Sequence, residues 1–450
     1  MYEIIEFDER LMARFVGGKG GFDMDILVMG NGFDLEHKIP SSYKNFLNFI
    51  ETFNNFYKYK DPAPLSMPPD KNRFRDRLSS ISPMYRDVAS LISGANTHEA
   101  SVLKEFYSIT EGNQWIDYFQ RCLKRRSEYG DTYNWVDIEE EIADVVINLT
   151  EYEQNYGYMP FYQTEVEQTR EKDGMHTKFA KDLINTVFER VKENDAKKIN
   201  GVKGNKTYRE LQKDWILFTQ RILEDFNKAV RALEIYLGFF VDFDKIKPST
   251  NFEGVKFDRF LTFNYTDTYQ MIYKTDKYDR SINGDFVHGK ADWKRVAKKN
   301  NMVVGIEEFL SDEKKDKNIE FVDYRKYYQR IVKRCDFSYH GLLQKEKDIA
   351  TWFVGHSMAA TDRDILRKLL PMRENNISKS YVCYYDDNAF RQEVVNLAQI
   401  LGQDYLTEIT CGAEPKIVFL NQTEIKKYMQ EKIRYDVTRA VVEGCSAGRR

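Results

Sequence analysis

Short apolar runs that end in glycine or polar residues constrain this chain most strongly. The first run is DILVM at residues 25–29, and it stops at Gly30. Runs of this length suit strands that are buried on both faces of a parallel sheet. Helical patterns at residues 361–370 and 389–401 separate several of the later runs, which predicts an α/β fold with a parallel, Rossmann-like sheet. The later runs begin at Arg259, Asp285, Asn301, Thr351, Ser380 and Lys416.

The part of the chain between the first run and the others is mainly helical. Apolar residues recur every three or four positions over residues 207–237, which predicts one long amphipathic helix. Because the first strand most simply joins the later sheet, this block is predicted to be an insertion within one α/β domain. The predicted division is an extension at 1–23, an α/β domain at 24–42 and 249–430, a helical insertion at 43–248 and a C-terminal tail at 431–450.

Composition narrows the class of protein. With 42% hydrophobic and 31% charged residues, the chain is globular rather than disordered. A formal net charge of −3 gives no overall field that would draw the protein to nucleic acid. The five cysteines form no C-x-x-C pair, which favours a reducing cytoplasm over a disulfide scaffold or a zinc ribbon. No apolar run approaches the roughly 20 residues of a membrane span, so we expect a cytoplasmic protein without a membrane partner.

Glycines and polar residues follow the predicted strands. In an open parallel sheet the loops at the carboxyl ends of the strands converge, and ligands lie there. We therefore expect these residues to form one site for a polar ligand. In chain order they are Gly30, Asn31, Gly32, Phe33 and Asp34, then Asn264 and Asp267, then His288, then Gly355, His356 and Ser357, and last Asn421.

The segment GNGFD at residues 30–34 is ambiguous when it is taken alone. It lacks the third glycine of G-x-G-x-x-G, so it is not an ordinary dinucleotide fingerprint. It is either a cradle for phosphate or a structural turn whose glycines relieve backbone strain. Histidine is a sharper signal, because the chain has only six. A lone histidine is more often a surface or core residue, but His288 stands at a predicted strand end and precedes a glycine.

The acidic segment WVDIEEEIAD at residues 135–144 offers a different chemistry. Its carboxylates fall on one side of a helix and Ile138 and Ile142 on the other, so the simplest interpretation is a solvated helix face. Alternatively, Glu140 and Glu141 could help to bind Mg²⁺ in a nuclease. The chain contains no nucleophile elbow, Walker lysine or H-E-x-x-H motif.

Taken as a set, these motifs resemble the bacteriophage abortive-infection AbiH family. The residues that carry the resemblance are ILVMGNGFDLEHKIPSSYKNF, WVDIEEEI, FLTFNYTDTYQMIY, VHG and FVGHSMAATDRDIL, and the resemblance spans roughly residues 24–421. Membership would imply a bacterial antiphage protein that stops growth or kills the infected cell. Two predictions about partners stay open: that a phage-derived molecule activates the protein, and that the chain forms a homo-oligomer.

The order of the motifs is also distantly similar to that of sirtuin-like NAD-consuming domains. In those domains a glycine turn, an Asn and Asp pair, a catalytic His-Gly, a G-x-S turn and a late Asn follow successive strands. The roles that this resemblance implies are the pyrophosphate for Gly30 and Gly32, the nicotinamide ribose for Asn264 and Asp267, the catalytic base for His288, and the adenosine side for Ser357 and Asn421.

Two departures from the sirtuin pattern bear on the chemistry. Tyr265 and Thr266 separate Asn264 from Asp267, where sirtuins have a single residue. The zinc-binding cysteine pairs of protein deacetylases are missing, which implies a metal-free reaction of NAD rather than a peptide substrate. We therefore expect NAD⁺ as the substrate, hydrolysed to ADP-ribose and nicotinamide, with no cofactor or metal. The alternatives are a nucleotide-binding sensor or scaffold without turnover and a metal-dependent nuclease toxin.

Overall fold

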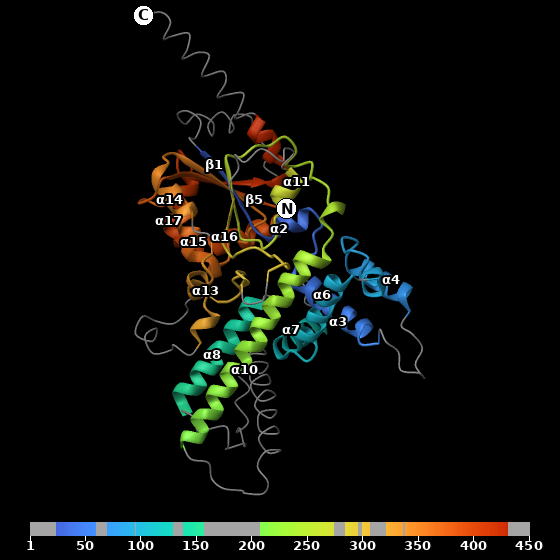
Figure 1. Ribbon diagram of the computed structural model, residues 1–450. Helices are drawn as coiled ribbons and strands as arrows, with labels where there is room; N and C mark the ends of the chain where they lie inside the picture. Colours follow the sequence, from blue (N-terminus) through green and yellow to red (C-terminus); the bar gives the residue numbers. More distant parts are fainter. Residues whose placement is uncertain are drawn as a thin grey trace, which may run out of the picture. The chain divides into compact units, whose positions relative to one another are not determined.

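The computed structural model describes nine segments of the chain (Figure 1). They are residues 24–59, 70–94, 96–128, 138–156, 208–273, 284–295, 299–306, 321–335 and 338–430. The predicted extension at 1–23 and the tail at 431–450 lie outside these segments.

The chain divides into two compact units. The α/β unit is built from the described parts of Met1–Ile39, Lys245–His288 and Cys335–Arg450, and the helical unit from those of Pro40–Asp244 and Gly289–Arg334.

A six-stranded sheet forms the centre of the α/β unit. All five strand pairs are parallel, and the strand order is β3-β2-β1-β4-β5-β6. This result confirms the predicted parallel, Rossmann-like α/β fold. The order reverses direction between β1 and β4, and the carboxyl ends of strands at such a point are where α/β proteins bind ligands. The strands are β1 Met24–Met29, β2 Arg259–Thr262, β3 Gly284–Phe286, β4 Ile349–Val354, β5 Ile377–Tyr384 and β6 Ile417–Asn421.

Helices cover both faces of this sheet. Successive residues of a strand point to opposite faces, so Val28 packs in one core, with Leu366 and Leu397, and Leu27 packs in the other, with Phe33 and Tyr269. The first core takes in α14 Ser338–Lys345, α15 Arg363–Leu369, α16 Asp387–Leu401 and α17 Gln403–Cys411, and the second takes in α2 Asn31–Glu36 and α11 Thr268–Tyr273. The predicted helices at 361–370 and 389–401 are therefore present as α15 and α16.

Aromatic side chains fill the core of the helical unit. Phe49 lies between Phe106 and Phe240, with ring centroids 6.0 and 4.7 Å away, and all three rings are fully buried. The first helix starts after Ser42, whose Oγ accepts a hydrogen bond from the Asn45 N–H at 3.2 Å and so caps it. The helices are α3 Tyr43–Tyr57, α4 Lys71–Ile81, α5 Val88–Gly94, α6 Thr97–Thr110, α7 Gln114–Glu128, α8 Ile138–Tyr156, α10 Tyr208–Ile235 and α13 Lys326–Lys333.

The long helix predicted at residues 207–237 is confirmed as α10, drawn in yellow-green in Figure 1. It continues as one turn of π-helix at Tyr236–Phe240. Phe218 and Phe226 are buried, as the apolar periodicity requires. The side chains of residues 208–215 lie outside the described part of the chain.

The run NMVVG at residues 301–305 is not a strand, and that prediction is wrong. Side chains bond its backbone instead: Gln329 Oε1 accepts from the Val304 N–H at 3.2 Å, Gln329 Nε2 donates to the Val304 carbonyl at 2.6 Å, and Asn300 Oδ1 accepts from the Met302 N–H at 2.8 Å. A buried apolar run with such a partner needs no neighbouring strand. The described residues of 289–334 fall in the helical unit, whereas the predicted α/β domain included them.

No helix among the described residues combines the length and the apolar character that crossing a bilayer requires.

Candidate functional site

The carboxyl ends of β1 and β4 meet through glycine backbone. The N–H of Gly30 donates to the Val354 carbonyl at 3.1 Å, and that of Gly32 donates to the Gly355 carbonyl at 2.7 Å. A Cβ on Gly32 would lie 2.6 Å from Cα of Gly355, and one on Gly355, where φ is +63°, would lie 2.1 Å from N of Phe33. Because two backbones touch here, these positions need glycine for a structural reason that does not depend on a ligand.

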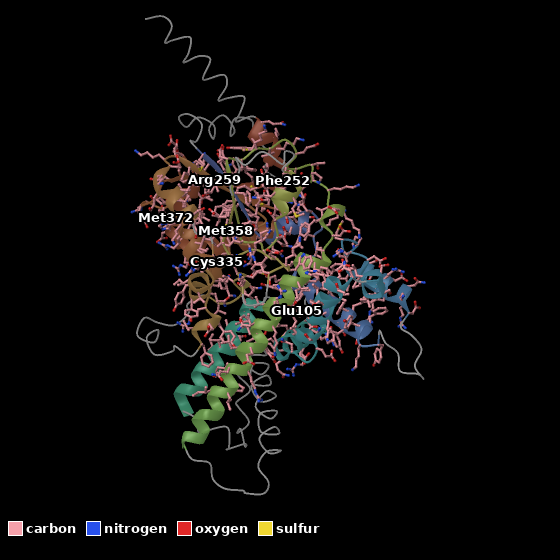
Figure 2. All side chains as sticks on the ribbon, viewed as in Figure 1. Glu105, Phe252, Arg259, Cys335, Met358 and Met372 are labelled. Atoms are coloured by element: carbon pink, nitrogen blue, oxygen red, sulfur yellow. The ribbon has the colours of Figure 1, made fainter. Side chains whose placement is uncertain are left out.

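The residues after Gly30 form the short helix α2 rather than the expected turn. Asn31 is half-buried at its start. Phe33 is fully buried and packs on Phe252, with ring centroids 5.2 Å apart. Phe252 is labelled in Figure 2. Phe33, which the sequence predicted as a ligand residue together with Asn31, therefore belongs to the core of the α/β unit.

Asp34 joins α2 to the loop that follows β2. Its buried carboxylate accepts from the hydroxyl of Thr266 at 2.5 Å and from that of Thr268 at 2.6 Å. A buried carboxylate without such bonds would be costly, and hydrogen bonds to a charged group are strong. Asp34 therefore holds in place the loop that carries Asn264 and Asp267.

Asn264 lies against the first glycine turn. Its Nδ2 donates to the Gly30 carbonyl at 2.9 Å, and its own N–H donates to Thr262 Oγ1 at 3.0 Å. Asp267 is half-buried in the residue position before α11, where its carbonyl accepts from the Met271 N–H at 3.0 Å. The structure thus brings Asn264 to the end of β1, and it places Asp267 at the start of a helix.

Two histidines share one buried carboxylate at the same edge of the sheet. Nε2 of His288 lies 2.9 Å from Oδ1 of Asp362, and Nε2 of His356 lies 3.9 Å from Oδ2 of the same residue. All three side chains are buried. Gly30 adjoins this group, since a Cβ on Gly30 would lie 2.6 Å from Cα of His356. The structure therefore brings His288, His356, Asn264 and the glycines together around one strand end.

The ring of Phe263 fills the space beside both histidines. Its centroid lies 4.3 Å from that of His356 and 5.4 Å from that of His288, with steep angles between the planes. Edge-to-face packing of this kind fixes ring orientation. The two imidazoles are therefore held by an apolar ring as well as by Asp362.

The hydrogen-bond partners indicate which ring nitrogen of each histidine carries the proton in the neutral form of the imidazole. An ionised carboxylate only accepts, so Nε2 of His288 carries a proton toward Asp362 and Nδ1 carries the lone pair. In His356, Nδ1 accepts from the Met358 N–H at 3.0 Å, so its Nε2 carries the proton. Met358 is labelled in Figure 2. His288 consequently has the arrangement of an imidazole base that a carboxylate orients.

Two of the predicted residues lie to the side of this group. Ser357 is exposed, and its carbonyl accepts from Asn396 Nδ2 on α16 at 2.7 Å. Asn421 caps a short 3₁₀ turn, where its Oδ1 accepts from the Thr423 N–H at 3.1 Å. Because strands are spaced about 4.8 Å apart, the end of β6 lies roughly 10 Å from that of β4. Asn421 is therefore not part of the histidine group.

His37 shows what a structural histidine looks like in this fold. Its Nδ1 lies 2.7 Å from the Phe33 carbonyl and its Nε2 lies 2.6 Å from the Tyr273 hydroxyl. Burial lowers the pKa of His37 below its usual value, because the charged form loses hydration. No carboxylate is bonded to its ring, and in this it differs from His288.

The acidic segment on α8 is engaged in packing within the helical unit. Glu139 pairs with Lys326 at 2.7 Å, and Glu141 is buried and accepts from the Tyr118 hydroxyl at 3.0 Å. The prediction of a solvated face is wrong for Glu141, since a hydroxyl partner allows the acid to face the core; Glu140 is exposed. Among the described residues, no group of three or more His, Cys, Asp or Glu side chains is arranged to hold a metal.

Sequence reasoning missed Asp362, the residue that links the two histidines. It lies in the segment TDRD after β4, 74 positions from His288. Its only local sign is an acid close to the start of a predicted helix, which is ordinary for a helix N-terminus. Thr266 and Thr268 were missed for the same reason: their partner, Asp34, is distant in the sequence.

Comparisons with known proteins give one match. The family model described as "Bacteriophage abortive infection AbiH" matches residues 26–384. The matched range runs from β1 to the end of β5, so it contains the glycine turns, Asn264 and both histidines. The curated proteins and the solved structures that were compared with the chain gave no match.

Proposed function

The chain belongs to the bacteriophage abortive infection AbiH family, and from that premise we propose that its α/β unit hydrolyses NAD⁺. Family membership assigns the protein to antiphage abortive infection. The proposed reaction releases nicotinamide and ADP-ribose, and loss of NAD⁺ would stop the metabolism on which phage growth depends.

The strand order and the position of the histidines support this proposal most. An open sheet of the order 3-2-1-4-5-6 binds dinucleotides where the order reverses, between β1 and β4. His288, Asp362 and Asn264 stand at that place. The base and its orienting carboxylate thus lie next to each other, and the amide contacts the glycine turn at the end of β1, where a dinucleotide would lie. This juxtaposition is the observation that carries the proposal.

The proposed hydrolysis of NAD⁺ needs few groups other than these. The bond between C1′ of the ribose and N1 of nicotinamide breaks, and the neutral nicotinamide leaves with the bonding electron pair. The oxygen of a water molecule bonds to C1′, and its proton passes to Nδ1 of His288. Asp362 stabilises the imidazolium that forms, as a carboxylate paired with a histidine does. A base in this role contributes about 10²- to 10⁴-fold to the rate.

Asn264 and the glycine turn have binding roles in the proposal. Because Nδ2 of Asn264 is bonded to the Gly30 carbonyl, its Oδ1 is the atom that would accept from a ribose hydroxyl. The N–H groups of Gly30 and Gly32 are bonded to carbonyls at the end of β4. The diphosphate would therefore rest beside this turn through the close approach that glycine allows, rather than through those two N–H groups.

The test uses purified full-length protein. Wild type and His288→Ala are incubated with NAD⁺, in the presence of phage lysate where activation is needed, and nicotinamide release is followed. We expect release by the wild type and a loss of at least about 10²-fold in the variant. A wild type that leaves NAD⁺ intact under both conditions, or a variant of full activity, would overturn the assignment.

A nucleotide-binding sensor without turnover is the second candidate. One observation favours it: His288 is only 4% exposed, so an attacking water would need a path that the described residues keep narrow. A sensor binds ADP-ribose and NAD⁺ with a measurable heat and releases no nicotinamide. The same preparation therefore separates the two candidates.

A further inference from the structure

Glu393 on α16 is a buried acid that packing does not explain. It is 5% exposed, and within the described chain its Oε2 has no hydrogen-bond partner. It occupies the core-facing side of the helix, one turn before Leu397. Burying a carboxyl group without a partner costs free energy. A residue of this kind therefore points to a partner that arrives from solution.

Aromatic rings stand at the same corner of the sheet. Tyr384 at the end of β5 lies 5.2 Å, centroid to centroid, from Phe390 on α16, and Phe390 lies 5.2 Å from Phe419 on β6. Phe390 is 37% exposed, and Tyr385, which follows Tyr384 in the chain, is 69% exposed. Exposed aromatic rings are stacking surfaces for nucleobases. This corner therefore offers a partly exposed aromatic ring, Phe390, near the buried acid.

The acids at this corner disfavour a phosphate group. Burial first, and then Asp386, raise the pKa of Glu393 to about 8. Burial also raises the pKa of the Tyr384 hydroxyl, and Glu424, Asp387 and Glu393 add to this. Nearby acids thus raise the pKa of both Glu393 and Tyr384. The corner suits a neutral ligand that donates hydrogen bonds rather than an anion.

The corner at the end of β5 lies next to the histidine group, because β4 is the neighbouring strand. β5 pairs with β4, so the two strand ends lie about 5 Å apart. Asn396, three residues after Glu393 on the same helix, donates to the Ser357 carbonyl in the loop after β4. A ligand that reaches from the end of β4 to the end of β5 would therefore meet Glu393.

We propose that Glu393, Tyr384 and Phe390 bind the adenosine end of a nucleotide. The base stacks on the aromatic rings, and a ribose hydroxyl or the adenine amino group donates to Glu393. Naming NAD⁺ as that nucleotide rests on the proposed function, but the subsite itself requires only binding. Its chemistry explains why an acid whose Oε2 lacks a hydrogen bond is kept in a helix face that otherwise packs on the sheet.

The test compares two probes on the full chain by calorimetric titration. ADP-ribose carries the adenosine end, and ribose 5-phosphate does not. In Glu393→Leu we expect affinity for ADP-ribose to fall at least about tenfold, the loss of one hydrogen bond to a carboxyl group, while binding of ribose 5-phosphate is unchanged. The control is Glu408→Leu, which removes an exposed acid from α17 and should change neither.

Several outcomes decide the matter. Unchanged ADP-ribose affinity in Glu393→Leu, an equal loss for both probes, or a wild type that does not bind ADP-ribose would overturn the subsite. If Glu393→Leu does not fold, Phe390→Ala takes its place, with the same expected loss. Loss of ADP-ribose binding without nicotinamide release by the wild type supports the subsite and overturns the hydrolase. If the wild type releases nicotinamide and Glu393→Leu has an unchanged KM for NAD⁺, the hydrolase is supported and the subsite is overturned.

Discussion

Buried charged groups have different kinds of partner in the two units. In the helical unit, Arg231 on α10 pairs with Glu234 at 2.6 Å and with Glu105, labelled in Figure 2, at 2.8 Å. Asn300 adds a bond to Glu234 at 2.7 Å. At the sheet edge of the α/β unit, one carboxylate faces two histidines, and Glu393 has no hydrogen-bond partner on Oε2.

This difference separates groups that hold the fold from groups that are available for chemistry. A buried ion pair whose members satisfy one another stabilises a particular packing and has no capacity left for a ligand. Carboxyl and imidazole groups that are buried together at a strand end have properties shifted toward binding and proton transfer. The comparison predicts large losses of stability from the first set and losses of activity or ligand binding from the second.

Breaking the Arg231 network should have the largest effect. In Arg231→Met the carboxylate of Glu234, which is fully buried, keeps its charge and loses its cation. We expect the free energy of unfolding to fall by about 3–5 kcal/mol. Denaturant titration measures it. The matched control is Lys228→Met on the same helix, whose pair with Asp225 is partly exposed and should contribute less than about 1 kcal/mol.

Disrupting the glycine contact between β1 and β4 should have the second largest effect on stability. Gly355→Ala places a Cβ in left-handed backbone and against N of Phe33, so we expect a loss of about 3 kcal/mol or more. Gly254→Ala has the same sign of φ, at +78°, but open space around the Cβ, and should cost about 1–2 kcal/mol. Equal losses in thermal unfolding would show that the backbone contact at the strand ends is not tight.

The variant Asp362→Asn tests whether the sheet edge takes part in catalysis rather than only in packing. An amide cannot stabilise the imidazolium of His288 as a carboxylate does, so we expect kcat for nicotinamide release to fall about 10- to 100-fold with little change in KM. Asp364→Asn, an exposed acid two residues on, should leave both unchanged.

The pH dependence of stability should carry the smallest of these effects. The pKa of Glu393 is about 8 in the folded protein, against an ordinary 4.5, so the folded state binds its proton more tightly than the unfolded state does. The stability that this proton contributes is complete below about pH 4.5 and is lost as the pH rises to 8 and above. Relative to Glu393→Gln, the wild type should lose about 1–3 kcal/mol across this window. Parallel curves in denaturant titrations would mean that Glu393 stays ionised.

Local patterns were enough to predict the frame of the α/β unit. The runs at β1, β2, β4, β5 and β6 are apolar because both faces of the sheet are covered, and that property is visible in five or six consecutive letters. The run at Asn301 has the same letters and forms no strand, since the side chain of Gln329 satisfies it. Which partner a buried run takes depends on residues far away in the sequence.

The site was predictable to the same degree and for the same reason. His288, Asn264 and the glycines were found because each stands at a strand end, which is a local property. Asp362 was not found, because its importance comes from being 2.9 Å from His288 across 74 positions. GNGFD was ambiguous because its glycines meet Gly355, a contact that no motif encodes.

One measurement tests the central claim most directly. Wild-type protein is incubated with NAD⁺ in heavy-oxygen water (H₂¹⁸O), and the products are analysed by mass spectrometry. We expect equal amounts of nicotinamide and ADP-ribose, with one heavy oxygen in each newly formed ADP-ribose, and neither product with His288→Ala. Intact NAD⁺ that is bound by the protein, or a product without heavy oxygen, would contradict hydrolysis at this sheet edge.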